Sequence, residues 1–326
     1  MKKIFVTGAS GFIGKPLCQA LVKSNKFVRA AVRSKNFFSQ QINLDYVSMG
    51  NINFNTNWRE VLTNFDCIIH CAGRAHIMKE TGVNVLEAYR SLNVDSTRRL
   101  AEQAAAAGVK RFIYLSSVKV NGESTDQLMY ASSSLNRKKK IFMYDDIPAP
   151  EDSYGISKWE AEKVLWEVSA RTGLNVIIIR SPLVYGKGVK GNLARLLKLI
   201  RTGIPLPFGL VKNQRSLIGL DNLIDIIIRC IDHPSAVGNT FLVSDGIDLS
   251  TSKLLHHIAF AMGQSVRLIP VPVYLLKITA RIFGKQRDLN RLIGSLRIDS
   301  SFAQKKLDWK PPVSITEGIN RMVQDS

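Results

Sequence analysis

A glycine-rich turn near the start of the chain constrains the fold more than any other stretch. Gly8, Gly11 and Gly14 follow the apolar run 4–6, and an amphipathic pattern of leucines begins directly after them. This order predicts a strand, a tight turn and a helix. Bare backbone in such a turn can approach a pyrophosphate, and the helix N-terminus presents free N–H groups to the phosphates. An ordinary glycine turn is the alternative, but the position between strand and helix favours a nucleotide site.

Apolar, β-prone runs recur along the first half of the chain, as expected when strands alternate with helices. They predict strands at 27–32, 45–49, 66–73, 111–116 and 176–179. Such runs are typical of strands buried on both faces, so we predict an α/β fold with a Rossmann-type doubly wound parallel sheet. Periodicity weakens from Ser181, so we assign 1–180 to an NAD(P)-binding domain and 181–326 to a smaller substrate domain. A return of the chain to the sheet near 216–244 stays open.

The chain is strongly basic, with a formal net charge of +19 over 326 residues. This charge suits polyanions, which include a nucleotide cofactor, a nucleotide-linked substrate, anionic lipid and nucleic acid. The densest basic run, 137–140, lies in a polar segment, and only Phe142 and Tyr144 are near it. Nucleic-acid binding requires basic residues interleaved with stacking aromatics, so we interpret this run as a solvated loop and predict no nucleic-acid partner.

The sequence lacks an apolar run of bilayer-spanning length, and a strand that starts at Ile4 leaves no room for a signal peptide. We therefore expect a cytoplasmic protein without stable membrane insertion, whose four cysteines are free thiols. The apolar segment 271–283 contains Lys277 and Arg281. A peripheral membrane contact is one interpretation of this segment, but a helix packed on the protein is the one we expect.

Arg33 follows the second predicted strand, where an NAD site usually places an acidic residue for the ribose hydroxyls. A guanidinium can instead pair with a 2′-phosphate, so Arg33 favours NADP(H), with NAD(H) also possible. The alternative is that Arg33 is one more surface cation in a very basic protein.

Two cysteines and a histidine lie close together in the predicted strand 66–73. Alternation along a strand puts Cys67 and Cys71 on one face and His70 on the other, so we predict no metal site. The small residues Ala72 and Gly73 at the end of this run would let a cofactor lie close to the backbone.

Tyr154 and Lys158 open a predicted helix, and a spacing of four puts both on one helical face. A phenol has a pKa of about 10, so it exchanges protons poorly at neutral pH unless its anion is stabilised. A neighbouring ammonium would lower that pKa, and Ser116 or Ser117, at the end of the predicted strand 111–116, could hold the reacting oxygen. Tyrosine and lysine four residues apart are common by chance. They indicate a catalytic site here because the glycine turn and Ser117 occur in the same chain. The polar stretch 121–152 is a candidate active-site flap.

Together these residues resemble an extended short-chain dehydrogenase/reductase of the NAD-dependent epimerase/dehydratase family, whose members act on nucleotide sugars. The resemblance covers nearly the whole chain, and its strongest parts are the glycine turn, Ser116–Ser117, Tyr154 and Lys158, 180–186, 215–218, 221–223 and 307–311. It implies catalysis by Ser117, Tyr154 and Lys158, and a homodimer formed through the helices that carry Asn93 and Tyr154.

The resemblance also implies two sets of binding residues. The cofactor set comprises Gly8, Ser10, Gly11, Phe12, Ile13, Gly14, Arg33, Asn51, Ile52, Cys71, Ala72, Gly73, Asn93, Ser116, Tyr154, Lys158, Ser181 and Val184. The substrate set comprises Arg74, Ser117, Val118, Lys119, Asn192, Leu193, Arg215 and Arg291. Within the second set, Asn192 and Leu193 would hold the base, and Arg215 with Arg291 would hold the diphosphate of a UDP-sugar.

One departure narrows the reaction. Sugar 4,6-dehydratases of this family carry Thr-Asp-Glu where this chain has Ser117-Val118-Lys119, so a dehydratase is not expected. Segments 70–78, 117–123 and 215–223 resemble most the bacterial branch that reduces UDP-4-keto-6-deoxy-N-acetylglucosamine to UDP-N-acetylquinovosamine for O-antigen. We therefore predict NADPH-dependent reduction of such a sugar at C4, with Tyr154 as proton donor. The alternatives are a UDP-hexose 4-epimerase with retained NAD and a non-catalytic cofactor-binding regulator or scaffold.

Overall fold

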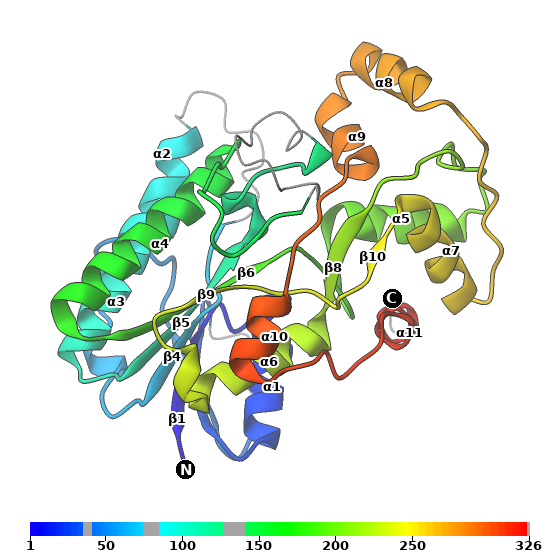
Figure 1. Cartoon of the computed structure of the whole chain (residues 1–326). Helices are drawn as coiled ribbons and strands as arrows, with labels where there is room; N and C mark the ends of the chain where they lie inside the picture. Colours follow the sequence, from blue (N-terminus) through cyan, green and yellow to red (C-terminus); the bar gives the residue numbers. More distant parts are fainter. Residues whose placement is uncertain (35–40, 75–84, 127–140, 325–326) are drawn as a thin grey trace.

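The computed structural model describes residues 1–34, 41–74, 85–126 and 141–324 (Figure 1). Three parts of the sequence-based interpretation lie outside the described residues: the solvated loop at 137–140, the stretch 75–78 of the resemblance, and the middle of the candidate flap.

Seven strands form the main sheet in the order β3-β2-β1-β4-β5-β6-β9, and every neighbouring pair is parallel. Their bounds are β1 Lys3–Thr7, β2 Phe27–Val32, β3 Leu44–Ser48, β4 Cys67–His70, β5 Arg111–Ser117, β6 Asn175–Ser181 and β9 Thr240–Leu242. The strand order reverses between β1 and β4, and open α/β sheets bind ligands at the carboxyl ends of strands at such a point. The predicted Rossmann-type α/β fold is confirmed.

Strand β4 ends at His70, three residues before the predicted end at Gly73. The backbone N–H of Ala72 donates to Thr7 Oγ1 at 3.2 Å and thereby leaves the strand ladder. Alternation along β4 agrees with the prediction: Cys67 and Cys71 pack on one side of the sheet, whereas His70 stacks on Tyr114 on the other side.

Helices cover both faces of the main sheet, as Figure 1 shows. On one face the core is formed by α1 Gly14–Lys23, α6 Leu220–Asp232 and α10 Ser301–Leu307. On the other face lie α3 Ser96–Ala106 and α4 Ser153–Thr172, and the short helix α2 Val85–Arg90 precedes α3. Successive strand residues alternate between these cores, which explains why the strands read as continuous apolar runs.

A smaller sheet carries the rest of the chain: β7 Leu183–Tyr185 pairs parallel with β8 Arg215–Gly219, and β8 pairs antiparallel with β10 Asp248–Leu249. The helices around it are α5 Gly191–Arg201, α7 Thr251–Ala261, α8 Val273–Ile282, α9 Gln286–Ile293 and α11 Ile315–Gln324. We call this sheet with these helices the smaller lobe. It has its own core, built mainly by α5, α7 and α11.

Asp245 and Asn222 tie the smaller lobe to the main sheet. The Asp245 carboxylate accepts bonds from Tyr185 Oη at 2.7 Å, from the Gly219 backbone and from Asn222 Nδ2. Asn222 also exchanges two bonds with the backbone of Val313, at 2.8 and 2.9 Å. These bonds explain why the motif Asp221-Asn222-Leu223 has an asparagine at its centre. The predicted domain boundary at residue 180 stays a prediction.

Helix α8 lies within the predicted helical segment 271–283, but its packing differs from the expectation. Only Leu276 and Ala280 of this helix are buried, because it meets the rest of the smaller lobe along a narrow face. Among the described residues no helix combines the length and apolarity needed to cross a bilayer.

Candidate active site

The glycine turn packs directly against the loop that follows β4. Gly8 has φ +66°, and a Cβ there would lie 2.7 Å from the backbone N of Ala72. A Cβ on Gly14, where α1 begins, would lie 2.1 Å from Gly8 O. No side chain caps the N-terminus of α1. The turn therefore leaves a cradle of bare backbone at a helix N-terminus, which is the geometry that binds a phosphate group.

Several other predicted cofactor residues lie at the carboxyl edge of the main sheet. Arg33 is exposed directly after β2, and Asn51 and Ile52 come shortly after β3. Ser181 is the last residue of β6, and Val184 packs against the core beside α1 and α6. The strand order brings these residues to one edge of the sheet.

Lys158 lies buried behind the cradle, on the first turns of α4. Its Nζ donates to Tyr114 Oη at 3.1 Å and to Leu115 O at 2.9 Å, so one of its three N–H donors stays available to a ligand. A Cβ on Gly73 would lie 3.2 Å from this Nζ, so glycine keeps the approach open. Burial lowers the pKa of Lys158 to about 8.

The Tyr154 phenol lies beside the Ser117 side chain, at the carboxyl end of β5. Burial raises the pKa of the Tyr154 phenol above its ordinary value, the charges of Asp152 and Tyr89 add to this, and the Ser117 side chain opposes it. The prediction that Lys158 lowers this pKa is wrong for the protein alone. Lys158 Nζ lies 5.9 Å from the centre of the Tyr154 ring, and its bonds go to Tyr114 and Leu115 instead.

The first turn of α4 explains how Tyr154 reaches Ser117. Asp152 caps the helix by accepting a bond from the Gly155 N–H at 2.7 Å. A Cβ on Gly155 would lie 2.8 Å from Lys119 O, so glycine allows the helix to begin against the backbone that follows Ser117. The sequence analysis missed Asp152, although an Asp three residues before Gly155 at a helix start is a known N-cap pattern.

Asn93 lies in a short π-helix, Ser91–Asp95, between α2 and α3. Its side chain is buried, donates to Ser157 Oγ at 3.0 Å and to Arg74 O at 3.2 Å, and accepts from the Arg74 N–H at 2.9 Å. These bonds fix the backbone after Gly73 against α4. Single π turns are frequent at functional sites because they re-aim one side chain.

His70 joins β1, β4 and α3 beneath the site. Its Nδ1 lies 2.6 Å from Thr7 Oγ1, and its Nε2 lies 3.0 Å from Thr97 Oγ1. Burial, with a smaller contribution from the charge of Lys158, lowers the pKa of His70 from 6.5 to about 3. His70 is therefore neutral at physiological pH.

This low pKa predicts a dependence of stability on pH. Below pH 6.5 the unfolded chain takes up a proton at His70 that the folded chain refuses until about pH 3. His70 thus lowers the free energy of unfolding by up to about 1.4 kcal/mol for each pH unit of acidification in that window. Urea unfolding between pH 7 and pH 5 should give a shallower loss for His70→Asn than for the natural chain. His256→Asn, which removes an exposed histidine, serves as the control, and equal slopes in all three proteins would contradict the prediction.

A buried ion pair occupies the end of β6. Arg180 and Glu162 are joined by three hydrogen bonds of 2.6–3.2 Å, and Glu162 also accepts from Ser116 Oγ at 2.5 Å. Arg180 Nη1 donates to Asn121 Oδ1 at 3.0 Å. The Ser116 hydroxyl therefore points at Glu162, and the sequence analysis did not foresee this network.

A second charged cluster lies on the other side of Tyr154. Lys119 Nζ pairs with Glu123 and Asp152, each at 2.5 Å, and lies 6.0 Å from the centre of the Tyr154 ring. Arg291 Nη2 lies 3.7 Å from the same Asp152 carboxylate. Lys119 and Arg291, two predicted substrate residues, thus meet beside Tyr154.

Arg215 lies at the start of β8, where its Nη1 donates to Gly294 O at 3.0 Å. Burial lowers the pKa of Arg215, the carboxylate of Glu123 opposes this, and the nearby charge of Arg291 lowers it further. Because the Arg291 charge disfavours the charged form of Arg215, an anion bound between the two guanidinium groups would be stabilised.

The remaining predicted substrate residues are spread over the smaller lobe and the site. Asn192 is half-buried in the first turn of α5, and the Leu193 side chain is buried in the core of the smaller lobe. Val118 packs with Phe142, Leu242, Leu296 and Ile298. Phe142 also exchanges backbone bonds with Arg297 and Asp299, so this described end of the candidate flap is held to the chain after α9.

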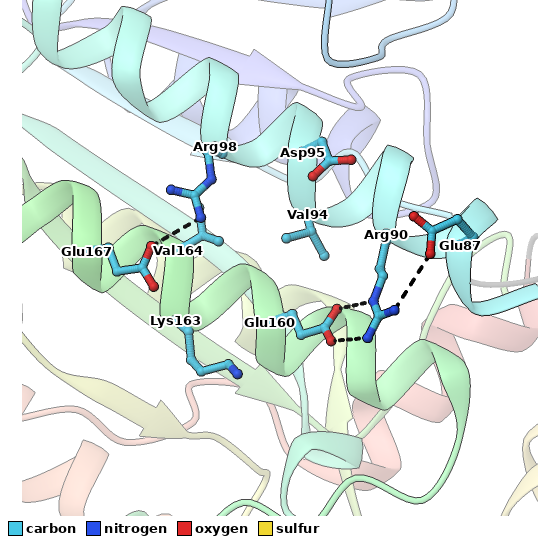
Figure 2. A pocket seen from close by; sticks show the side chains of 9 residues that line it. All are labelled: Glu87, Arg90, Val94, Asp95, Arg98, Glu160, Lys163, Val164 and Glu167. Carbon is cyan, nitrogen blue, oxygen red and sulfur yellow. Dashed lines mark hydrogen bonds and ion pairs between the residues drawn. The ribbon is translucent and has the colours of Figure 1, made fainter.

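A separate groove of about 300 Å³ runs along the outer side of α4 (Figure 2). Arg90 and Glu160 form a bidentate pair at 2.7 and 2.9 Å across it, and Arg98 pairs with Glu167 at 3.1 Å. The groove contains none of the predicted catalytic side chains. It lies where the predicted homodimer would form, and that oligomeric state stays a prediction.

The seven-stranded parallel sheet and the glycine turn at its carboxyl edge define a Rossmann-type fold. The model of the NAD dependent epimerase/dehydratase family matches residues 4–244. The chain belongs to this family.

Individual relatives agree with the family. The chain is 42% identical over 328 residues to the UDP-glucose 4-epimerase of Vibrio cholerae, with 99% of this chain and 95% of the relative covered. It is 24% identical over 340 residues to the N-acetyl-alpha-D-glucosaminyl-diphospho-ditrans,octacis-undecaprenol 4-epimerase of Escherichia coli O157:H7, covering 98% of this chain and 94% of the relative.

A solved structure shows the same fold. The UDP-glucuronic acid 4-epimerase of Bacillus cereus, in complex with NAD, superposes with a TM-score of 0.77 at 20% identity, over 99% of this chain and 96% of that chain. The predicted family is confirmed, and these relatives favour the epimerase alternative over the predicted reductase.

Proposed function

We propose that this protein is a UDP-hexose 4-epimerase that uses a tightly held nicotinamide cofactor. The observation that carries the proposal is the Tyr154 phenol beside Ser117 at the carboxyl end of β5, with Lys158 one helical turn away. The identity of 42% to a UDP-glucose 4-epimerase supports the same assignment.

The residues present fit a dinucleotide cofactor. A Cβ on Gly8 or Gly14 would strike the neighbouring backbone of Ala72 or Gly8, so these positions stay bare backbone, which suits the close approach of a pyrophosphate. Lys158 keeps one donor for a ribose hydroxyl, and Gly73 leaves the approach to it open. When bound, the nicotinamide would supply the chemistry of hydride transfer at C4 of the sugar.

The protein itself handles the proton. Because its pKa is raised, Tyr154 is a neutral phenol at pH 7 and can donate its proton to the sugar O4. In the opposite direction the Tyr154 phenolate would accept the proton of the sugar O4 hydroxyl and return it in the second half-reaction. The Ser117 side chain is the group that favours this anion. Ser117 also orients the sugar oxygen toward Tyr154.

The residues after Ser117 argue against elimination of water. Val118 is buried and apolar, and the Lys119 ammonium is engaged by Glu123 and Asp152. Neither side chain can serve as the acid or base that a 4,6-dehydratase needs.

The substrate diphosphate would bind between Arg215 and Arg291. A dianion there would remove the repulsion between these two cations, and guanidinium groups bind phosphate oxygens in pairs. Asn192 and the backbone at Leu193, at the N-terminus of α5, are the proposed contacts for the uracil base.

The test is direct conversion of UDP-sugars by the purified enzyme. Without added NADPH, we expect interconversion of UDP-glucose with UDP-galactose, or of the corresponding N-acetylhexosamines, followed by NMR of the anomeric protons. Absence of both conversions in the presence of added NAD⁺ would overturn the epimerase assignment.

A 4-ketoreductase of UDP-4-keto-6-deoxy-hexosamines is the second candidate, and exposed Arg33 at the end of β2 is the observation that favours it. A reductase consumes NADPH stoichiometrically with the 4-keto sugar. In that case Arg33→Ser should weaken NADPH binding by about tenfold or more through loss of a charge-assisted phosphate contact, with NADH binding unchanged. Unchanged NADPH affinity in Arg33→Ser, measured by fluorescence titration, would remove the argument for this candidate.

A further inference from the structure

Helix α8 carries a stripe of apolar side chains that face away from the protein. Tyr274, Ile278 and Ile282 recur every four residues and are 64%, 52% and 73% exposed. Phe283 directly follows the helix and is 75% exposed, and Leu275 widens the same stripe. Residues four apart lie on one helical face, so this helix presents a continuous apolar surface.

Basic residues flank this stripe, and the first acidic residue after it is Asp288, which directly follows Arg287. Lys277 and Arg281 lie one turn apart on α8, and Lys285 and Arg287 follow it, all of them exposed. From Leu249 to Arg287 the chain contains no Asp or Glu. Within the described part of the chain, no carboxylate forms an ion pair with any of these four cations. An apolar face edged by lysine and arginine is the pattern of a helix that lies in a membrane interface.

The helix is also held loosely by the rest of the smaller lobe. Only Leu276 and Ala280 are buried, and a cavity of about 560 Å³ opens beside them, lined in part by Phe208 and Leu289. Phe283 and Lys285 lie at this cavity too, so the apolar surface of the helix continues into it. In Figure 1, α8 stands at the outer edge of the molecule, beyond α9, where a flat surface could reach it.

We propose that α8 is a membrane-surface helix that docks this protein on an anionic lipid bilayer. The stripe Tyr274–Ile278–Ile282 would lie among the acyl chains near the headgroups, and Lys277, Arg281, Lys285 and Arg287 would contact lipid phosphates. Charge decides between a bilayer and a second copy of this chain. A second copy brings the same cations and a net charge of +19, so the two patches repel, whereas anionic headgroups attract both patch and protein.

The experiment is flotation of the full-length protein with vesicles of two compositions at low ionic strength. Binding to vesicles of phosphatidylcholine with phosphatidylglycerol is expected, and binding to phosphatidylcholine alone should be at least about tenfold weaker. The triple variant Tyr274→Ser/Ile278→Ser/Ile282→Ser should reduce binding to the anionic vesicles by about tenfold or more. Lys277→Ser/Arg281→Ser should reduce it roughly 30-fold.

Matched variants distinguish binding through α8 from nonspecific binding through the net charge or through exposed apolar residues elsewhere. Lys305→Ser/Lys306→Ser removes two exposed cations from α10, and Ile42→Ser removes a residue that is 86% exposed in the main-sheet part of the chain. Both variants should bind anionic vesicles as strongly as the natural chain does, whereas Ile282→Ser should bind them more weakly. All variants should keep the activity of the natural chain toward UDP-sugars in solution, which shows that they are folded.

Three results would overturn the proposal. The first is absence of binding to the anionic vesicles, and the second is an equal loss in the control and α8 variants. The third is a concentration-dependent self-association, seen by sedimentation, that the α8 triple variant abolishes while vesicle binding stays undetected. That result would assign the stripe to a second copy of the chain.

Discussion

Replacing Tyr154 with phenylalanine is expected to lower kcat by about 10²–10⁴-fold, the usual contribution of a positioned proton donor. The ring would keep its place against Tyr89, whose ring centre lies 6.0 Å away, so the substitution removes little besides the hydroxyl. The lost hydroxyl is the group beside Ser117 that is proposed to exchange a proton with the sugar O4. Affinity for the UDP-sugar should change by less than about tenfold, because the proposed diphosphate contacts are unaltered.

Single-turnover kinetics and a separate binding titration distinguish these two effects. Tyr274→Phe, which removes an equivalent hydroxyl from exposed α8, is the matched control and should keep full activity. If Tyr154→Phe retained more than about a tenth of kcat, general acid–base catalysis by this residue would be refuted.

Breaking the buried ion pair between Arg180 and Glu162 should cost more stability than any surface substitution. Glu162→Leu leaves the Arg180 guanidinium without three bonds of 2.6–3.2 Å, in a position where Arg180 is 4% exposed. It also leaves Ser116 without its acceptor. An uncompensated buried charge costs about 3–5 kcal/mol, and Arg180→Leu should cost a similar amount.

The double variant tests whether the cost comes from the unpaired charge. Glu162→Leu/Arg180→Leu removes both charges and should be less destabilised than the sum of the two single variants by more than about 2 kcal/mol. Urea unfolding measures all three, and Arg98→Leu/Glu167→Leu, which removes the exposed pair in Figure 2, should change stability by less than about 1 kcal/mol. Additive losses in the double variant would show that the two residues act independently.

The sequence predicted most strands of the main sheet well because they are buried apolar runs, as in β1, β4, β5 and β6. Strand β2 matches the prediction at both ends, and β5 differs by one residue. Strand β4 ended early because a contact distant in sequence, between Thr7 and Ala72, draws the backbone out of the ladder. Periodicity within one segment contains no information about such a contact.

The candidate site was predictable as a set of residues but not as an electrostatic arrangement. A spacing of four put Tyr154 and Lys158 on one face, yet it could not show that the Lys158 ammonium bonds to Tyr114 and Leu115. Nor could it show that burial dominates the pKa of the phenol. Arg180 and Glu162 were missed as a pair because their contact depends on how α4 lies over β6.

Helix α8 was predicted as a helix, but its packing could not be predicted from the sequence. An apolar pattern indicates a helix, but it does not say which side the protein covers. Here the covered side is limited to Leu276 and Ala280, and this is a property of the smaller lobe as a whole.

The carboxylate of Asp245 bears on how a sugar nucleotide could enter and leave. Tyr185 is the last residue of β7, Gly219 is the last residue of β8 and Asn222 lies in α6, and all three bond to this carboxylate. Hinge bending of the two sheets would have to break these bonds together, and Asn222 would also lose Val313. Substrate exchange should therefore proceed by local rearrangement of side chains and loops at the site. Proteolytic cleavage of one chain segment between the main sheet and the smaller lobe would leave these two parts joined by the other segments.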